Sequence, residues 1–209
     1  MTTVIKQAES LRERKRVATR RAILETAIAM FSERGFEAPT IEQIAASAGI
    51  GKGTVYNYFA TKEEILVAFM VELEGKFQRR ISRYAEAEGS LEHILTEVLW
   101  FQFRLKQPYL GFVRIFLAQL ILRCSELQEH VLRMQAAVDP PMIHLFTRLR
   151  ERGLIPGDCD VLTLVHEFKC MHFGLSCLWA MEEPPFPNAR AAIAAQVGWF
   201  AGRLERSTR

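Results

Sequence analysis

The sequence predicts an all-α protein of about nine or ten helices, and two observations support this prediction. Apolar residues recur at helical spacing along almost the whole chain, and no run of alternating apolar and polar residues indicates a strand. The chain has 209 residues, of which 49% are hydrophobic and 24% charged. This composition is typical of a globular chain with a sizeable core, and it excludes a disordered chain or a fibrous repeat.

The first predicted helix spans residues 11–34. Its apolar residues form one stripe, in which Ile23, Ala27 and Phe31 are each four positions apart. Gly35 follows directly and suits a left-handed residue after the last turn of a helix. This helix therefore has one face for a core and a defined end.

Two short helices and a long one are predicted next. Thr40 and Gln43 form a capping box that begins a helix of two turns, and residues 49–51 supply a tight glycine turn. Residues 52–59 are a further short helical unit, and a second capping box, Thr61 with Glu64, begins a long helix over 62–88.

Two short helices joined by a glycine turn, with a longer helix before them, are the outline of a helix-turn-helix. The second short helix must enter a DNA major groove about 12 Å wide, so its outer face needs small or polar groups. Val55 and Phe59 face inward at a spacing of four. Gly53 lets the backbone approach a phosphate, and the free amides after Thr40 offer a second phosphate site. The outward residues are Lys52, Gly53, Thr54, Tyr56, Asn57 and Tyr58.

The charge distribution agrees with a polyanionic partner. The formal net charge is only +3, but residues 1–62 hold ten Lys and Arg against six Glu. Six of the ten residues from Arg12 to Arg21 are basic. This run is either a nucleic-acid contact or simply a solvated start of a helix.

The stretch TRRAILETAIAMFSERGFEAPTIEQIAASAGIGKGTVYNYFATKEEIL, residues 19–66, closely resembles the DNA-binding domain of the TetR (tetracycline repressor) family of bacterial transcription regulators. The resemblance implies a DNA-binding domain over residues 1–62 and a helical domain for ligand sensing and dimerisation over 63–209. It also implies which side chains meet the operator and that the basic arm adds phosphate or minor-groove contacts. The family's pattern is carried by Ala27, Phe31, Gly35, Thr40, Ile44, Ala45, Ala48, Gly49, Lys52, Gly53, Tyr56, Phe59 and Lys62. The implied DNA-binding residues are Arg14, Lys15, Arg16, Arg20, Thr40, Lys52, Gly53, Thr54, Tyr56, Asn57, Tyr58 and Lys62.

The remainder of the chain is predicted from its own pattern. Gly89-Ser90, Pro108, Pro140-Pro141, residues 153–157 and residues 182–187 separate the helices. The proline pair either divides two helices or kinks one long helix. The predicted helices span residues 90–106, 108–122, 125–138, 140–153, 160–181 and 188–206.

The last helix predicts an interface with a second copy of the chain. Between Arg190 and Arg203 it has one polar side chain, Gln196, so no face suits water. The chain cannot easily cover both sides of this helix, so one side should meet another subunit. The alternative is an internal helix in a monomer. The family resemblance implies a four-helix interface made by the last two long helices of each copy, and the residues expected there are Leu175, Leu178, Ala191, Ala195, Gly198 and Gly202.

Large rings in the middle of the chain predict a chamber for a small apolar or aromatic effector, because an apolar pocket with a few polar groups is typical of ligand sites. Aromatic residues at helical spacing also serve as plain core, so that interpretation stays open. The residues expected to line the chamber are Trp100, Phe103, Phe112, Phe116, Met142, Phe146, Phe168 and His172.

These features predict a sequence-specific, ligand-responsive regulator, most often a repressor in this family, that binds a palindromic operator as a homodimer. The alternatives are a DNA-binding dimer without ligand control and an all-helical enzyme. No phosphate-binding loop, HExxH motif or nucleophile elbow is present in the sequence, so we expect no catalysis and no cofactor.

We also expect a cytoplasmic protein without a metal site. No signal-type segment occurs at the N-terminus, and the longest segments free of Asp, Glu, Lys and Arg have 12 residues. His166, Cys170 and Cys177 share a helical face, where a metal site is conceivable, but buried thiols are the favoured interpretation.

Overall fold

The computed structural model describes residues 2–122, 124–181 and 188–206, with side chains throughout except at 2–10, 122–131, 133–135, 137–138 and 205–206. Every regular element within these ranges is a helix, which confirms the predicted all-α class. The chain divides into two compact units, Met1–Met70 and Val71–Arg209. None of the described helices is long and apolar enough to cross a membrane.

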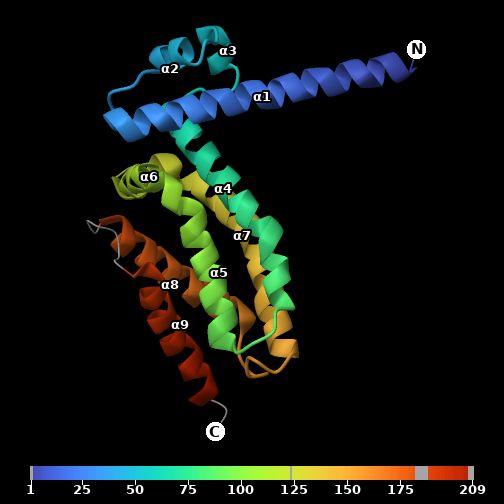
Figure 1. The fold of residues 1–209 in the computed structure, drawn as a ribbon, viewed down its shortest axis with the longest axis vertical. Helices are drawn as coiled ribbons and strands as arrows, with labels where there is room; N and C mark the ends of the chain where they lie inside the picture. Colours follow the sequence, from blue (N-terminus) through green and yellow to red (C-terminus); the bar gives the residue numbers. More distant parts are fainter. Residues whose placement is uncertain (1, 123, 182–187, 207–209) are drawn as a thin grey trace. The chain divides into compact units, whose positions relative to one another are not determined.

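The first unit contains α1 (Thr2–Arg34), α2 (Ile41–Ser47), α3 (Lys52–Tyr56) and the beginning of α4 (Lys62–Ala85) (Figure 1). Its core is made by Ile23, Leu24 and Phe31 of α1 together with Ile44 and Val55, all of which are almost fully buried. The predicted start of the first helix near residue 11 was wrong, because α1 begins at Thr2. Residues 2–10 contain no Pro or Gly that would end a helix there.

Local sequence signals define the short helices of this unit. The capping box at α2 is confirmed, since Thr40 Oγ1 accepts from the Gln43 amide at 3.2 Å and Gln43 Oε1 accepts from the Thr40 amide at 3.0 Å. Gly49 has φ of +66° in the turn that follows. The predicted helix over 52–59 was too long: α3 ends at Tyr56, and turn hydrogen bonds to the Val55 carbonyl carry the chain to a buried Phe59.

The second unit continues α4 and adds the remaining helices (Figure 1). Helix α5 packs on α9, and α8 packs on α6, α7 and α9. The core of the unit is one hydrophobic cluster contributed by α4, α5, α6, α7, α8 and α9. The elements that follow α4 are α5 (Leu91–Lys106), a 3₁₀ turn (Gln107–Tyr109), α6 (Leu110–Leu122), α7 (Cys124–Glu151), α8 (Val161–Met181) and α9 (Ala189–Arg206).

Pro140 and Pro141 lie inside α7 and do not divide it. Of the two alternatives for the proline pair, one long helix is confirmed, so the helices expected over 125–138 and 140–153 are a single helix. Two prolines remove two backbone donors from the helix. Burial of Leu145 and Phe146 just after them offsets that loss, and the Lys169 ammonium of α8 binds Asp139 Oδ1 at 2.5 Å just before them. The break predicted over 182–187 lies outside the described residues.

Candidate functional site

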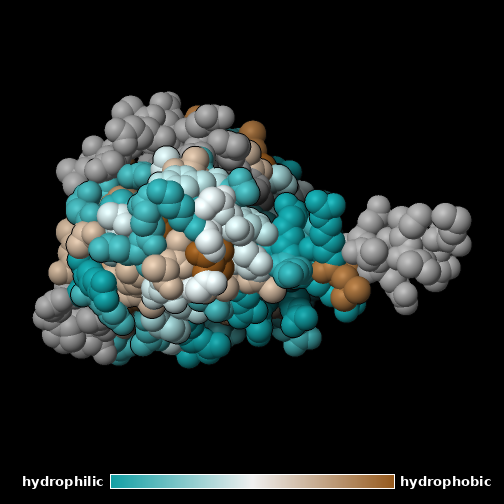
Figure 2. Space-filling view, turned by 90° about the horizontal axis from the view of Figure 1, so that it is seen from above, coloured by the Kyte–Doolittle hydropathy of each residue, from teal (hydrophilic) through white to brown (hydrophobic). Residues whose placement is uncertain are grey.

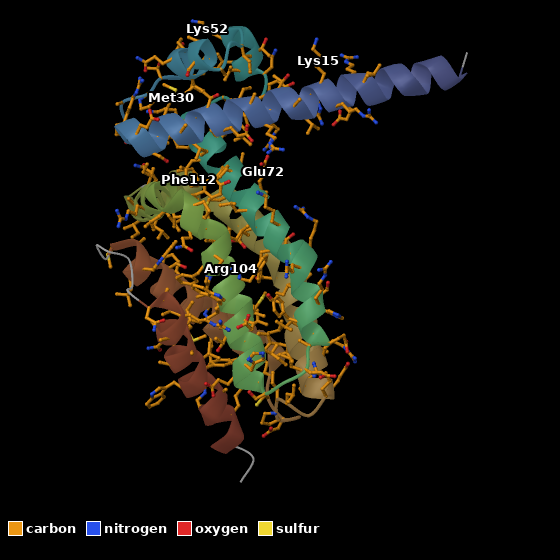
Figure 3. The ribbon with its side chains drawn as sticks, viewed as in Figure 1. Lys15, Met30, Lys52, Glu72, Arg104 and Phe112 are labelled. Carbon is orange, nitrogen blue, oxygen red and sulfur yellow. The ribbon has the colours of Figure 1, made fainter. Side chains whose placement is uncertain are left out.

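The exposed face of α2 and α3 carries the predicted reading residues. Side chains of Lys52, Thr54, Tyr56 and Asn57 are exposed, whereas that of Tyr58 is half-buried. Lys52 extends outward from the beginning of α3 (Figure 3). Figure 2 shows hydrophilic residues interspersed with paler and hydrophobic ones on the surface that it views. The exposed face of α2 and α3 presents polar groups to solvent and buries only Val55 of α3.

Thr40 lies at the N-terminus of α2, as predicted. Its hydroxyl oxygen accepts from the Gln43 amide, and its O–H group donates to the Glu42 carboxylate. No Cβ stands at Gly53, and a Cβ built there would meet nothing within 4 Å. Gly53 therefore leaves room for a phosphate to approach the backbone.

Glu42 occupies the same face, and sequence reasoning missed it. Its Oε1 accepts a hydrogen bond from the Tyr56 hydroxyl at 3.2 Å and lies 3.6 Å from Lys52 Nζ. Its own backbone amide, the Tyr56 hydroxyl, Lys52 and the Thr40 hydroxyl lower the pKa of the carboxyl. The carboxylate is thus charged and is shared among three of the residues expected to bind DNA.

The basic arm on α1 consists of three exposed cations and the half-buried Arg20, which have different partners. Arg16 forms a bidentate pair with Glu13, with both nitrogen-to-oxygen distances at 2.9 Å. The Arg20 guanidinium lies over the Phe59 ring, 5.3 Å from its centroid. Arg14 and Lys15 are exposed, and Lys15 extends away from the helix (Figure 3). Exposed ion pairs of this kind exchange readily for phosphate contacts.

Lys62 lies at the start of α4 but turns inward. Its ammonium donates to the Phe36 carbonyl at 2.8 Å and to the Glu37 carbonyl at 3.0 Å, and it lies over the Phe36 ring at 4.9 Å. These contacts tie α4 to the loop after α1. Two of its three donors are therefore used within the chain.

A second feature is an apolar surface on α8 and α9. Trp199 is 77% exposed, and Phe173, Leu178 and Met181 are exposed large apolar residues on α8. Of these four residues, only Leu178 is among those predicted from the sequence for the interface. The opposite side of α9 is buried, as Ile193 and Val197 are fully covered.

The other residues expected at this interface lie as follows. Ala191 and Ala195 are exposed, and Gly202 is half-buried. Gly198 faces α5 of its own chain, because a Cβ there would lie 3.4 Å from Glu92 Oε1. Leu175 belongs to the core of its own chain at 6% exposure.

The residues expected to line an effector chamber lie in the interior of the second unit. Phe146, Phe168 and Phe200 form a ring cluster with centroid distances of 5.4 to 6.3 Å. Phe103, Met142, Phe112 and Phe116 are also buried, and Trp100 packs against the core at partial exposure.

A polar cluster interrupts this apolar interior. Lys106 Nζ lies 3.1 Å from Glu74 Oε1, and both side chains are over nine-tenths buried. His172 Nε2 is within hydrogen-bond distance of Lys106 Nζ at 3.4 Å and of the Ser176 hydroxyl at 3.3 Å. Removal from water lowers the pKa of His172 well below its usual value, and the Lys106 ammonium lowers it further. The imidazole is therefore neutral, and its Nε2 accepts from both neighbours.

The cysteine face of α8 differs from the prediction of buried thiols. Cys170 is exposed, Cys177 is half-buried, and Cys170 Sγ lies 3.6 Å from His166 Nε2. The described side chains contain no group of three His, Cys, Asp or Glu placed to hold a metal ion. Cys124 has no described side chain.

Comparison with known proteins identifies the first unit. Residues 23–69 match the family model described as bacterial regulatory proteins, tetR family. The transcriptional repressor KstR2 of Rhodococcus jostii is 36% identical over 37% of this chain, and the match spans 40% of its own length.

Two solved structures match most of the chain. The fatty acid degradation regulator FadR of Bacillus halodurans has a TM-score of 0.72 and 20% identity, with 88% of this chain and 95% of that chain covered. FadR of Bacillus subtilis, solved in complex with stearoyl-CoA, has a TM-score of 0.68 and 22% identity over 88% of this chain and 96% of that chain.

The helix order and the exposed α2–α3 face define the class of the first unit: it is a helix-turn-helix domain. The matched residues place the DNA-binding segment of the first unit, residues 23–69, among the bacterial regulatory proteins of the tetR family.

Proposed function

We propose that this chain is a homodimeric repressor that binds a palindromic operator and leaves it when an acyl-CoA thioester binds. The observation that carries the DNA-binding part is the exposed polar face of α3 in a domain that matches the family. The protein would act in the cytoplasm, where operator DNA is accessible, and the proposal needs no catalytic step.

The apolar surface on α8 and α9 supports the dimer. A 77% exposed Trp199 and a 50% exposed Leu178 are large apolar side chains that water solvates poorly. An isologous contact through this surface would cover the same residues on both copies. Two reading helices about 34 Å apart would then meet successive major grooves on one side of the DNA.

The interior of the second unit supports an effector with an apolar chain. Two similar structures were solved with acyl-CoA ligands, FadR of Bacillus subtilis with stearoyl-CoA and FadR of Thermus thermophilus with lauroyl-CoA. An acyl chain would replace contacts among Phe103, Met142, Phe146 and Phe168, which are all apolar and buried. The sequence alone predicted an apolar or aromatic effector, and an acyl chain is the apolar case.

The buried polar cluster supplies the anchor for the polar end of such a ligand. Lys106 and Ser176 carry hydrogen-bond donors that now point at His172 Nε2, and a thioester carbonyl could accept from either. Glu74, the ion-pair partner of Lys106, belongs to α4, the helix whose first residue is Lys62. An effector that disturbs this cluster would therefore act on a helix shared by both units. Such an effector changes DNA affinity only to the extent that it binds the DNA-binding conformation of the chain and the released conformation with different affinities.

The DNA-binding proposal is tested by selecting bound duplexes from random sequence and measuring the affinity of the enriched duplex. Asn57→Ala should relax sequence preference, at about 1 to 3 kcal/mol for a lost bidentate base contact. The matched control is Ser32→Ala, which removes an exposed polar side chain of α1 outside the expected DNA contacts. Equal loss of affinity on all sequences would remove Asn57 from the reading role, and no enriched sequence with the wild type would remove the proposed function.

A further inference from the structure

We infer that Glu42 is a specificity-determining residue of the DNA-binding face, which weakens binding to arbitrary DNA more than binding to the operator. The inference rests on the proposed function and adds a role for a residue that sequence reasoning missed. Glu42 contributes the carboxylate that contacts both Tyr56 and Lys52 on α3.

The Glu42 carboxylate lies between α2 and α3. Glu42 is in the first turn of α2, two residues after Thr40, and its side chain crosses to α3 to meet Tyr56 at 3.2 Å and Lys52 at 3.6 Å. About half of the Glu42 side chain remains exposed, at 49%. The carboxylate therefore lies among the groups that would face DNA, and it is open to a ligand.

The contacts of Glu42 with α3 add little to the folding stability of the domain. A surface ion pair between exposed side chains contributes little to folding. The first-turn position is favourable for any acidic residue, but that placement does not require contact with α3. The contacts of Glu42 thus fix the Tyr56 hydroxyl and the Lys52 ammonium more than they hold the domain together.

The Glu42 carboxylate affects a non-specific DNA complex and an operator complex differently. Non-specific binding consists almost wholly of cation contacts to phosphate, so a carboxylate beside Lys52 opposes it on every sequence. At the operator, the amino group of a cytosine or an adenine in the major groove can donate to the same carboxylate. This hydrogen bond offsets the repulsion between the carboxylate and DNA at the operator sequence only. The ratio of operator affinity to non-specific affinity therefore rises.

The test compares Glu42→Gln with the wild type on the duplex enriched by selection and on a shuffled duplex of equal length. Glutamine keeps an acceptor for Tyr56 and removes the charge. We expect affinity for the shuffled duplex to rise about tenfold, its log-log salt slope to steepen by about one unit, and the affinity ratio to fall about tenfold. Glu33→Gln on α1 is the matched control, and it should leave the ratio unchanged.

Thermal unfolding of each variant separates this role from a merely structural one. Unchanged unfolding with a lowered ratio supports the inference. An unchanged ratio, or equal loss of affinity on both duplexes, overturns it. If the wild type itself prefers no duplex, the proposed function fails first, and that result is distinct from a failure of the Glu42 inference alone.

Discussion

The two units of this chain use their side chains in opposite ways. In the first unit, the groups expected to act are exposed on α2, α3 and α1, and the buried residues only support them. In the second unit, the groups expected to meet an effector are buried, and the exposed apolar residues lie on α8 and α9. A DNA-reading surface can thus be preformed, whereas an interior ligand must compete with existing core contacts.

The largest effect should come from breaking the proposed dimer. Trp199→Glu places a charge in the apolar surface of α8 and α9, so the chain should sediment as a monomer at micromolar concentration. Losing the second reading helix removes the avidity of paired binding, about 100- to 10,000-fold in operator affinity. Ile121→Glu on α6, at a similarly exposed position, is the control. A Trp199→Glu protein that remains dimeric would contradict the interface.

An intermediate effect should separate two lysines of the first unit. Lys52→Met removes an exposed cation, so the log-log salt slope of DNA binding should flatten by about 0.9 with unchanged stability. Lys62→Met leaves two carbonyls without their charged donor, which should lower the free energy of unfolding by about 1 to 3 kcal/mol. Denaturant unfolding and salt titrations measure both quantities. A flattened slope with unchanged stability in Lys62→Met would make Lys62 a phosphate contact instead.

A smaller effect should appear in the pH dependence of the second unit. His172 has a pKa well below its usual value in the folded chain, so the unfolded chain takes up the proton first as the pH falls. The stability contributed by neutral His172 is complete above about pH 6.5 and should be lost progressively as the pH falls below that value. Denaturant unfolding at several pH values should show this loss in the wild type and its absence in His172→Gln. The control variant His144→Gln should keep this loss of stability. If the free energy of unfolding depends on pH equally in the wild type and in His172→Gln, the loss does not come from His172.

Short-range signals explain what the sequence predicts well. The capping box of Thr40 and Gln43, the positive φ of Gly35 and Gly49, and the buried pair Val55 and Phe59 are each encoded within a few residues. The helix-turn-helix is accordingly predictable from the sequence. Helix α1 extends further than expected because a helix that begins without a capping residue gives no local sequence signal of its first residue.

Long-range packing explains the rest. The contact of Lys62 with the Phe36 carbonyl joins residues 26 positions apart, and that of Glu42 with Tyr56 joins residues 14 apart. No local pattern encodes either contact. Leu175 illustrates the same limit, since α8 is apolar on two sides and only packing decides which side its own core takes.

The proposal that an acyl-CoA releases the chain from its operator is tested most directly by measuring operator affinity with and without a saturating long-chain acyl-CoA. The measurement uses the enriched duplex and the intact chain, with free coenzyme A as the control ligand. The account predicts that stearoyl-CoA weakens operator binding about 5- to 150-fold, the usual range of coupling between two sites, and that coenzyme A does not. Equal operator affinity with stearoyl-CoA and with coenzyme A would contradict it.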